Sequence, residues 1–554
     1  MLSNLTLSPV LKEVGWYNAI GVLLVLFILW SVYRFNGDDG GPPRLRETIP
    51  FLSNLVDMAR DTGAFWNRAL KTMQSLDTEI LRFRLGRRQF YLVMGDKKTN
   101  VLFRPNTGLV KHQSTIRLSK VMFGPTKKDM ARLAADVSGR NKEPLPGTEH
   151  VDERLWITWH HIFAENLSRA QPTGDIAAMF FDNFTARIRE LIPEVGKPAD
   201  LLVWKFVRRH QTECAGRALS GDLIFDTNPD LLDAMADYEL AILPIAFGPP
   251  RWLNPRPHRA RDRWLSMTRR FMAEALETYD WDSPEAKSAT AWEPVLGSPL
   301  IRSLARWLLD AGFDVQTIAG ACGQQIPNQN SNTVPATAWC IMDALMCPDP
   351  ELLPNLRREA EALVVVDSET GKRALDVQKL QGNSSSPTPW HQAVYAETLR
   401  LRSGLPITRH AVRDTEIDGF PVPKGSMVQA PVPIAALSAV WDVEGHPAEE
   451  FWPRRHLTAS QTADGVKTVE FALGSRSGYW FPYGGGIGIC PGRHFAKQEI
   501  IGTLALLLAQ FDFEVVGWVM PDGESRSDRG ARNGNGFAVY QPDRDLKVRM
   551  TRRW

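Results

Sequence analysis

The sequence predicts a mainly α-helical fold with small β-sheets, in one large domain behind an N-terminal transmembrane helix. Three observations predict it: several stretches carry apolar residues at helical spacing, only a few short runs resemble strands, and one long apolar run lies near the N-terminus. With 554 residues the chain is long for one domain, but one large domain is possible.

Helical patterns are clearest in the C-terminal half. Residues 352–366 and 391–402 place apolar side chains on one face and charged side chains on the other. Residues 496–511 are mostly apolar and predict a buried helix shortly after Cys490. We therefore expect helices to form the interior of the domain.

Strand patterns are fewer and shorter. They occur at 80–86 and 89–95, around a turn at 415–430, and at 546–553 near the C-terminus. These runs predict small sheets beside the helical body.

The apolar run near the N-terminus covers residues 16–33, WYNAIGVLLVLFILWSVY, with Asn18 as the main exception. Eighteen helical residues span roughly 27 Å, which is close to the hydrocarbon thickness of a bilayer. A cleaved signal peptide would end in small residues, whereas Tyr33-Arg34-Phe35 stands here. We therefore expect a retained transmembrane anchor.

The anchor divides the chain into segments. We expect a lumenal N-terminus at 1–15, a transmembrane helix at 16–34, a Pro/Gly-rich hinge at 35–50 and the folded body at 51–554. The hinge sequence NGDDGGPPRLRETIP has the composition of a linker.

Basic residues indicate the orientation of the anchor. Arg34, Arg44 and Arg46 follow the span and only Lys12 precedes it, which favours a body on the cytosolic side. We expect a single-pass protein of the endoplasmic reticulum membrane. Asn4, in an Asn-Leu-Thr pattern, would then face the lumen and could carry a glycan.

Charge and cysteine content exclude several functional classes. The 65 basic and 63 acidic residues nearly balance, so nothing marks a nucleic-acid binder. The five cysteines are scattered and form no CxxC pair, which argues against a disulfide framework and fits a reducing compartment. Four of them are explained as small buried apolar residues, but Cys490 stands in an unusual loop.

The loop FPYGGGIGICPGRHF, residues 481–495, surrounds Cys490 with glycine. Pro491 suits the first position of a helix, which would place the sulfur near free N–H groups and the positive end of the helix dipole. The glycines would let a flat ligand approach the backbone closely. Haem needs only one axial sulfur, whereas zinc partners at their usual spacing are missing.

This loop resembles the haem-binding loop of the cytochrome P450 family, in the form seen in its steroid-hydroxylase-like and filamentous-fungal branches. The resemblance implies that Cys490 is the axial thiolate of the haem iron and that Gly486 and Gly492 are the two loop glycines. Tyr483 stands where phenylalanine is usual. Gly488 stands where many members have an arginine, which the steroid-hydroxylase-like branch also lacks.

Two upstream motifs support the same resemblance. AETLR supplies Glu397 and Arg400 on one helical face, and EFWPRRHL supplies Arg455. The resemblance implies that these three form a structural clamp behind the haem loop. It also implies the cytochrome P450 fold for residues 51–554, which would be a haem-thiolate catalytic domain.

Residues 323–345 resemble the long helix that crosses the distal face of the haem. Ser331 and Asn332 occupy the two places where most members have an acid and a threonine, and Thr333 follows. An amide can hold a water molecule but titrates poorly. One interpretation is that a chain of water molecules bound to these three residues still relays protons. The alternatives are peroxide rearrangement without a relay, and a structural Asn332 that satisfies backbone freed by Pro335.

A further haem contact is expected from the segment GLPITRHAV. The resemblance implies that Arg409 binds a haem propionate, with His410 as the second choice. The neighbouring apolar residues, including Ile407, favour a lipophilic substrate.

The resemblance implies a membrane-anchored monooxygenase that uses O2 and oxidises a lipophilic terpenoid, meroterpenoid or polycyclic substrate in secondary metabolite biosynthesis. The chain has no convincing dinucleotide fingerprint, so electrons should come from a partner, NADPH–cytochrome P450 reductase. Arg493 and Lys497 could help to dock it, although ordinary surface charge explains them equally well. The alternative is a haem-thiolate isomerase or dehydratase that acts on a peroxide without reductase; a haem-binding sensor is a third class.

Overall fold

The computed structural model describes residues 40–105, 107–288, 290–366, 373–376, 388–461, 467–536 and 538–554, and the single positions 21, 22, 26, 369, 371, 379 and 380. The expected glycan site at Asn4 and nearly all of the expected anchor at 16–34 lie outside the described residues. Among the residues that are described, no helix is both long and apolar enough to cross a bilayer.

The described chain forms two compact units. The first takes its residues from Met1–Val110 and Pro406–Ala435, and the second from Lys111–Leu405 and Ala436–Trp554. The segment 406–435 therefore leaves the second unit and joins residues that lie about 300 positions earlier in the sequence.

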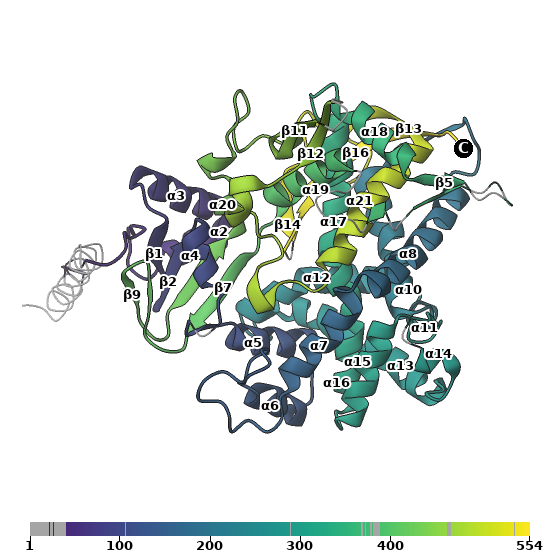
Figure 1. Cartoon of the computed structure of the whole chain (residues 1–554). Coiled ribbons are helices and arrows are strands. Elements are labelled where there is room, and N and C mark those ends of the chain that lie inside the picture. The colour runs from purple at the N-terminus through teal and green to yellow at the C-terminus, as the bar shows by residue number, and fades with distance from the viewer. Residues whose placement is uncertain are drawn as a thin grey trace, which may run out of the picture. The chain divides into compact units, whose positions relative to one another are not determined.

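The first unit is built on a five-stranded sheet with the order β1-β2-β10-β7-β3 (Figure 1). β10 runs parallel to β2, and the other neighbours are antiparallel. Its elements are α2 (Ser53–Arg60), α3 (Thr62–Ser75), β1 (Ile80–Leu85), β2 (Arg88–Val93), α4 (Asp96–Val101), β3 (Leu109–Val110), β7 (Pro406–Ala411), β8 (Thr415–Ile417), β9 (Phe420–Val422), β10 (Met427–Pro431) and α20 (Val432–Ala436).

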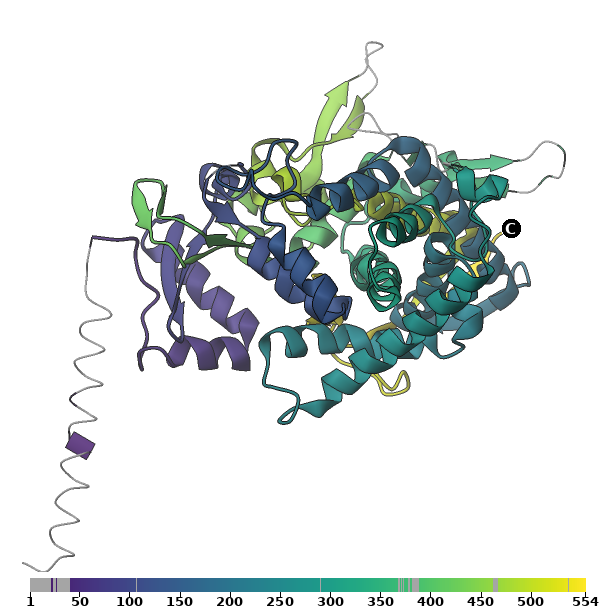
Figure 2. The ribbon, with the colours of Figure 1, turned by 90° about the horizontal axis from the view of Figure 1, so that it is seen from below.

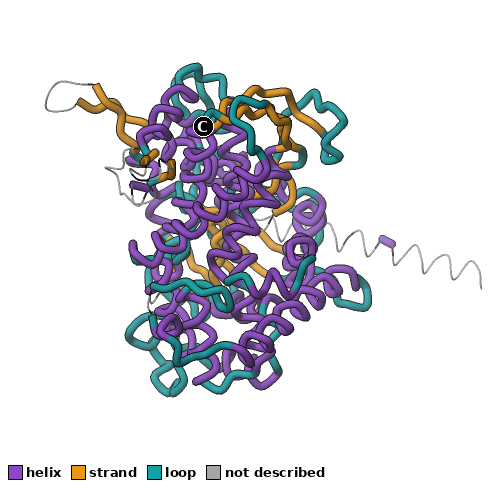
Figure 3. The backbone as a smooth tube through the Cα atoms, turned by 90° about the vertical axis from the view of Figure 1, so that its right-hand side faces the viewer, coloured by secondary structure: helices purple, strands orange, loops and turns teal. Residues whose placement is uncertain are grey.

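The second unit is mainly helical (Figures 2 and 3). Its helices are α5 (His112–Met122), α6 (Lys127–Ala135), α7 (Leu155–Leu167), α8 (Ala170–Leu191), α9 (Val203–Phe206), the π-helical turn η1 (Val207–Gln211), α10 (Thr212–Ser220), α11 (Leu223–Thr227), α12 (Leu231–Phe247), α13 (Pro255–Thr278), α14 (Pro284–Lys287), α15 (Pro299–Asp310), α16 (Val315–Gly323), α17 (Gln325–Met346), α18 (Leu352–Ala362), α19 (Pro389–Arg402) and α21 (Arg493–Gln510). Short 3₁₀ turns are η3 (Ala439–Trp441), η4 (Pro453–His456), η5 (Gly474–Tyr479) and η6 (Gly486–Gly488).

The strands of the second unit form small sheets. They are β4 (Pro198–Leu202), β5 (Val364–Val366), β6 (Arg373–Leu375), β11 (Leu457–Gln461), β12 (Lys467–Phe471), β13 (Phe511–Val519), β14 (Asn533–Gly536), β15 (Tyr540–Pro542) and β16 (Asp545–Arg552). The largest has the order β13-β16-β4, and the others are two-stranded. The fold is therefore mainly helical with small sheets, as the sequence predicted.

The core of the second unit surrounds α17, which contacts α10, α12, α19 and α21. α17 and α21 are buried along most of their length, and Trp339 of α17 is fully buried. Because α17, α19 and α21 lie side by side in Figure 1, residues far apart in sequence meet in one interior.

Two predicted helices have different ends in the structure. The helix expected at 352–366 stops at Ala362, and Val364–Val366 form β5. Three consecutive valines favour a strand because their branched Cβ atoms restrict helical rotamers. The helix expected from 496 begins three residues earlier, at Arg493.

Candidate active site

The loop before α21 exposes one sulfur atom. Cys490 is exposed, whereas Cys347 is half-buried and the other three cysteines are buried. The loop folds back on itself because the Cys490 N–H donates to the carbonyl of Tyr483 at 3.0 Å. Gly484 and Gly486 have φ angles of +73° and +61°, a region that other residues rarely adopt. These two glycines are therefore required by the course of the backbone.

The start of α21 supplies hydrogen-bond donors to the sulfur. α21 begins at Arg493, two residues later than a helix with Pro491 at its first position would. Protein around Cys490 raises the pKa of its thiol, and the backbone N–H groups of Gly492 and Arg493 oppose that rise. A Cβ atom at Gly492 would lie 3.9 Å from the Cys490 Sγ, an ordinary contact, so nothing within this part of the chain demands glycine there.

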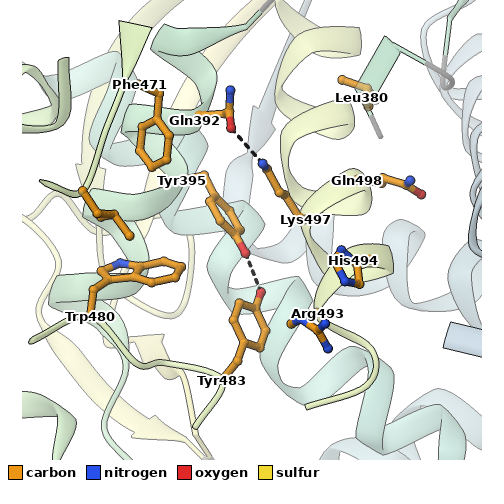
Figure 4. Close-up of a pocket in the computed structure, with 11 residues that line it drawn as sticks. Leu380, Gln392, Tyr395, Phe471, Trp480, Tyr483, Arg493, His494, Lys497 and Gln498 are labelled. Carbon is orange, nitrogen blue, oxygen red and sulfur yellow. Dashed lines mark hydrogen bonds between the residues drawn. The ribbon is translucent and has the colours of Figure 1, made fainter. Parts of the chain in front are cut away.

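Helix α19 holds the loop from one side. The hydroxyl groups of Tyr395 and Tyr483 lie 2.8 Å apart (Figure 4). The indole N–H of Trp480 donates to the carbonyl of Ala396 at 3.0 Å. The tyrosine that replaces the usual phenylalanine is therefore part of the hydrogen bonding between the loop and α19.

A hollow of about 230 Å³ lies against this side of the loop (Figure 4). Trp480 and Tyr395 form part of its wall, and Arg493 and Lys497 supply positive charge. The ammonium group of Lys497 donates to Gln392 Oε1 at 2.8 Å, and burial lowers the Lys497 pKa. Lys497 thus has an internal partner in addition to any role at the surface.

The three residues of the expected clamp are brought together. Arg400 Nε and Nη2 each lie 2.8 Å from one oxygen of Glu397, and Arg455 Nε lies 2.8 Å from Oε1. His456 Nε2 lies 2.9 Å from Oε2, and the Trp452 N–H donates to Oε1 at 2.9 Å. Every side chain of this cluster except Trp452 is buried.

The cluster keeps Glu397 ionised. Burial alone would raise the pKa of Glu397, but the hydrogen bonds and positive charges of Arg400 and His456 outweigh it, and the net pKa is lowered. The remaining N–H groups of Arg400 and Arg455 donate to backbone carbonyls, including those of Ala448 and Glu450. The cluster therefore ties α19 to the irregular segment before β11.

The three residues expected on the distal side of the haem, Ser331, Asn332 and Thr333, have different hydrogen-bond partners. Asn332 Oδ1 accepts the N–H groups of Ala538 and Val539 at 3.2 Å each, in the turn between β14 and β15. It is thus bonded to a distant turn, not to the backbone that Pro335 frees.

The hydroxyl groups on either side of Asn332 have other partners. Ser331 Oγ lies 2.7 Å from Glu239 Oε1 of α12. Thr333 Oγ1 donates to the carbonyl of Gln329 in its own helix, 2.7 Å away.

A buried carboxyl group links α21 to α17. Glu499 Oε1 accepts Gln211 Nε2 at 2.7 Å, and Thr333 Oγ1 lies 3.4 Å from the same oxygen. Gln211 is the last residue of the π-helical turn η1, a rare conformation that often marks functional sites. Burial raises the pKa of Glu499 to about 7.

Arg409 lies on β7 of the first unit. Its Nε donates to the carbonyl of Leu102 at 3.1 Å, and its Nη1 donates to the carbonyl of Thr408 at 3.0 Å. These contacts fix the base of the guanidinium group. Its expected role at a haem propionate stays a prediction.

The residues around Cys490 fit a flat ligand that carries its own metal. The sulfur is accessible, two N–H groups face it, and glycines remove side chains from the approach. To bind a metal ion, a cysteine must lose the proton of its thiol, and here only the thiol of Cys490 would have to do so. Haem meets these conditions, since its iron takes one axial thiolate and the porphyrin supplies the other donors.

Loss of Arg455 should destabilise the protein strongly. Arg455→Met leaves the buried Glu397 with fewer partners, and we expect the free energy of unfolding to fall by about 3–5 kcal/mol. Arg169→Met is the control, because Arg169 pairs with Glu165 at a position where both side chains are more than 60% exposed. That change should cost less than about 1 kcal/mol. Equal urea midpoints for the two variants would contradict the importance of the cluster.

Glu499 should make stability depend on pH. Its folded pKa of about 7 exceeds the ordinary 4.5, so the folded state binds the proton more tightly than the unfolded state. The stability that Glu499 contributes should therefore be fully present below pH 4.5 and fall by about 3 kcal/mol as the pH rises to about 7. Glu499→Gln should remove this component, which urea titrations of both proteins at several pH values will reveal. Parallel stability–pH curves would refute the assignment.

Comparisons with known proteins agree with this geometry. The cytochrome P450 family model matches residues 331–529, a span that includes Ser331, Glu397 and Cys490. The cytochrome P450 monooxygenase calL of Penicillium decumbens is 33% identical to this chain, and the match covers 100% of both proteins. The monooxygenase efuG of Hormonema carpetanum is 28% identical over 93% of this chain and 91% of its own. The monooxygenase fsoE of Humicola fuscoatra is 29% identical over 63% and 61%.

A match of this identity along the whole chain shows common family membership, and the geometry around Cys490 is consistent with it. The chain therefore belongs to the cytochrome P450 family and is a haem-thiolate monooxygenase.

Proposed function

We propose that this protein is a membrane-anchored monooxygenase of secondary metabolite biosynthesis. It oxidises a lipophilic substrate of the terpenoid, meroterpenoid or other polycyclic kind, with O2 and with electrons from NADPH–cytochrome P450 reductase. It lies in the endoplasmic reticulum membrane with a single span, and its catalytic domain faces the cytosol.

The observation that carries the proposal is similarity along the entire chain to a fungal monooxygenase, combined with one accessible sulfur at the matching loop. Three of the similar monooxygenases come from fungi. This supports the substrate class, which we expected from the likeness to the filamentous-fungal branch. The apolar segment around Ile407 favours a lipophilic molecule.

Cys490 would hold the haem iron through its sulfur. Bound haem supplies the iron that activates O2 for transfer of one oxygen atom. The N–H groups of Gly492 and Arg493 stabilise negative charge on the sulfur, and thereby limit the electron density that it donates. Glu397, Arg400 and Arg455 keep α19 in place, and Tyr395 and Trp480 connect α19 to the loop.

Asn332 would supply an oriented donor on the distal side. Because its Oδ1 accepts two backbone N–H groups, the orientation of the amide is fixed and its Nδ2 points the other way. Within the described residues Nδ2 has no hydrogen-bond partner, so it can donate to a water molecule or a substrate atom. An amide does not titrate near neutral pH, so it orients such a group but does not supply protons.

The reductase requirement distinguishes this proposal from peroxide chemistry. We expect microsomes that contain the protein and a reductase to convert a lipophilic scaffold to a product heavier by one oxygen atom. The product should carry label from ¹⁸O2 and should require NADPH, as mass spectrometry will show. Turnover of a hydroperoxide scaffold without reductase or NADPH, and no labelled product, would instead identify an isomerase or dehydratase.

The membrane anchor can be tested by extraction. Full-length protein should stay with microsomes during alkaline carbonate extraction, because a spanning apolar helix is not displaced by removal of charge contacts. A variant that lacks residues 1–34 should be released by the same treatment while it keeps its reduced–CO spectrum. Release of the full-length protein would exclude the anchor.

A further inference from the structure

Helix α12 brings a carboxyl group to the position on α17 where the sequence lacks one. Glu239 Oε1 lies 2.7 Å from Ser331 Oγ, across 92 positions of sequence. Ser331 is buried, and the resemblance of residues 323–345 to the distal helix of the family implies that it stands where most members have an acid. The side chain of Glu239 therefore occupies the region of the missing acid, although it belongs to another helix.

A cavity of about 160 Å³ lies between these residues and the surface. Its inner wall includes Ser331, Asn330 and Glu239, of which Ser331 and Asn330 are buried. Its outer wall includes Lys205 and Arg209, which are exposed. One water occupies about 30 Å³ in the liquid, so the cavity has room for several water molecules beside polar groups that can bind them.

The surroundings of Glu239 allow it to exchange protons. Burial raises its pKa, whereas the hydrogen bond from Ser331 and the charge of Arg208 work in the opposite direction. The other charged groups that line the cavity are Lys205, Arg209 and Asp233, the last on α12 itself. Glu239 thus keeps its proton to a higher pH than an ordinary glutamate, and basic side chains line the same cavity.

We propose that Glu239 is the proton-relay carboxyl of this enzyme, which takes protons from water in the cavity and passes them to Ser331. A separation of 2.7 Å suits both directions of hydrogen bonding. When Glu239 is ionised, the Ser331 hydroxyl donates to it. When Glu239 is protonated, it donates to Ser331 Oγ, and the hydroxyl hydrogen turns toward another acceptor.

The stoichiometry of the reaction creates the need for such a group. Insertion of one oxygen atom consumes O2, two electrons and two protons, and it gives the hydroxylated substrate and one water. Without substrate, O2 takes two electrons and two protons to form hydrogen peroxide, or four of each to form two waters. NADPH, through the reductase, supplies the electrons in every case. Cleavage of the O–O bond therefore depends on timely proton supply, which Asn332 cannot provide.

Glu499 is the competing carboxyl group. It lies 3.4 Å from Thr333 Oγ1, which is long for a hydrogen bond, and Thr333 donates at 2.7 Å to its own helix instead. Glu239 has the shorter bond to the distal segment and lines a cavity that reaches exposed residues. The geometry therefore favours Glu239 as the relay.

Substrate-free turnover tests the proposal without knowledge of the substrate. Wild type and Glu239→Gln are each supplied with reductase, NADPH and O2, and the NADPH, O2 and hydrogen peroxide balances are measured. We expect Glu239→Gln to form water about tenfold more slowly and to release correspondingly more peroxide, with a larger solvent isotope effect on water formation. Ser331→Ala should act in the same direction, and Ser331→Thr and Glu239→Asp should restore part of the water formation.

Infrared spectroscopy provides a reading that is independent of turnover. The difference between the spectra of resting wild type and resting Glu239→Gln isolates the carboxyl band of Glu239. Because burial raises its pKa, we expect a protonated carboxyl band that persists to a higher pH than the band of an ordinary glutamate and disappears as the pH rises further. The reduced–CO spectrum of each variant verifies that the haem is bound as in wild type.

Asp237→Asn is the matched control. Asp237 is on the same helix, its side chain is 62% exposed, and it faces Arg263 at 3.6 Å. This variant should leave the peroxide share and the isotope effect unchanged. The proposal is overturned if Glu239→Gln behaves like Asp237→Asn, or if Glu499→Gln alone shifts the products toward peroxide.

Discussion

The chemistry of this protein depends on holding the sulfur of Cys490 in one place while leaving it open to a ligand. A loop rich in glycine cannot do this alone, because it has few side chains with which to bind its surroundings. Helix α19 provides the support from outside the loop, through Tyr395 and Trp480. Helix α19 is held in turn by Glu397, whose two carboxylate oxygens are shared among Arg400, Arg455 and His456.

This arrangement explains how the protein can bury a cluster of charged groups, although removal of charges from water costs free energy. Burial of a lone carboxylate would be strongly unfavourable, but here each oxygen accepts more than one hydrogen bond and two guanidinium groups balance the charge. The guanidinium groups also satisfy backbone carbonyls such as those of Ala448 and Glu450. The cluster thereby fixes a segment that has little regular secondary structure of its own.

The sequence predicted those parts of the site that lie within short motifs. Cys490 could be located because a glycine-rich loop surrounds it, and the Glu397–Arg400 pair because AETLR resembles a family motif that precedes such a loop. The partners of Ser331 and Thr333 could not, since Glu239 and Glu499 lie 92 and 166 positions away and meet them only through helix packing. The role of Asn332 was hidden for the same reason, because its partners are backbone N–H groups in a distant turn. The end of α18 was missed for a different, local reason. The helix stops at Ala362 because the valines that follow prefer a strand, although the apolar spacing there is helical.

The central claim is that the sulfur of Cys490 is the axial ligand, and its direct test is the absorption spectrum of the reduced protein with CO. Wild type should show the reduced–CO absorption band after which the cytochrome P450 family is named. Cys490→His keeps a side chain able to bind iron, so it should retain haem but show the spectrum of an imidazole-ligated haem protein. A Cys490→His protein with the unchanged wild-type band would show that another group binds the iron and would contradict the account.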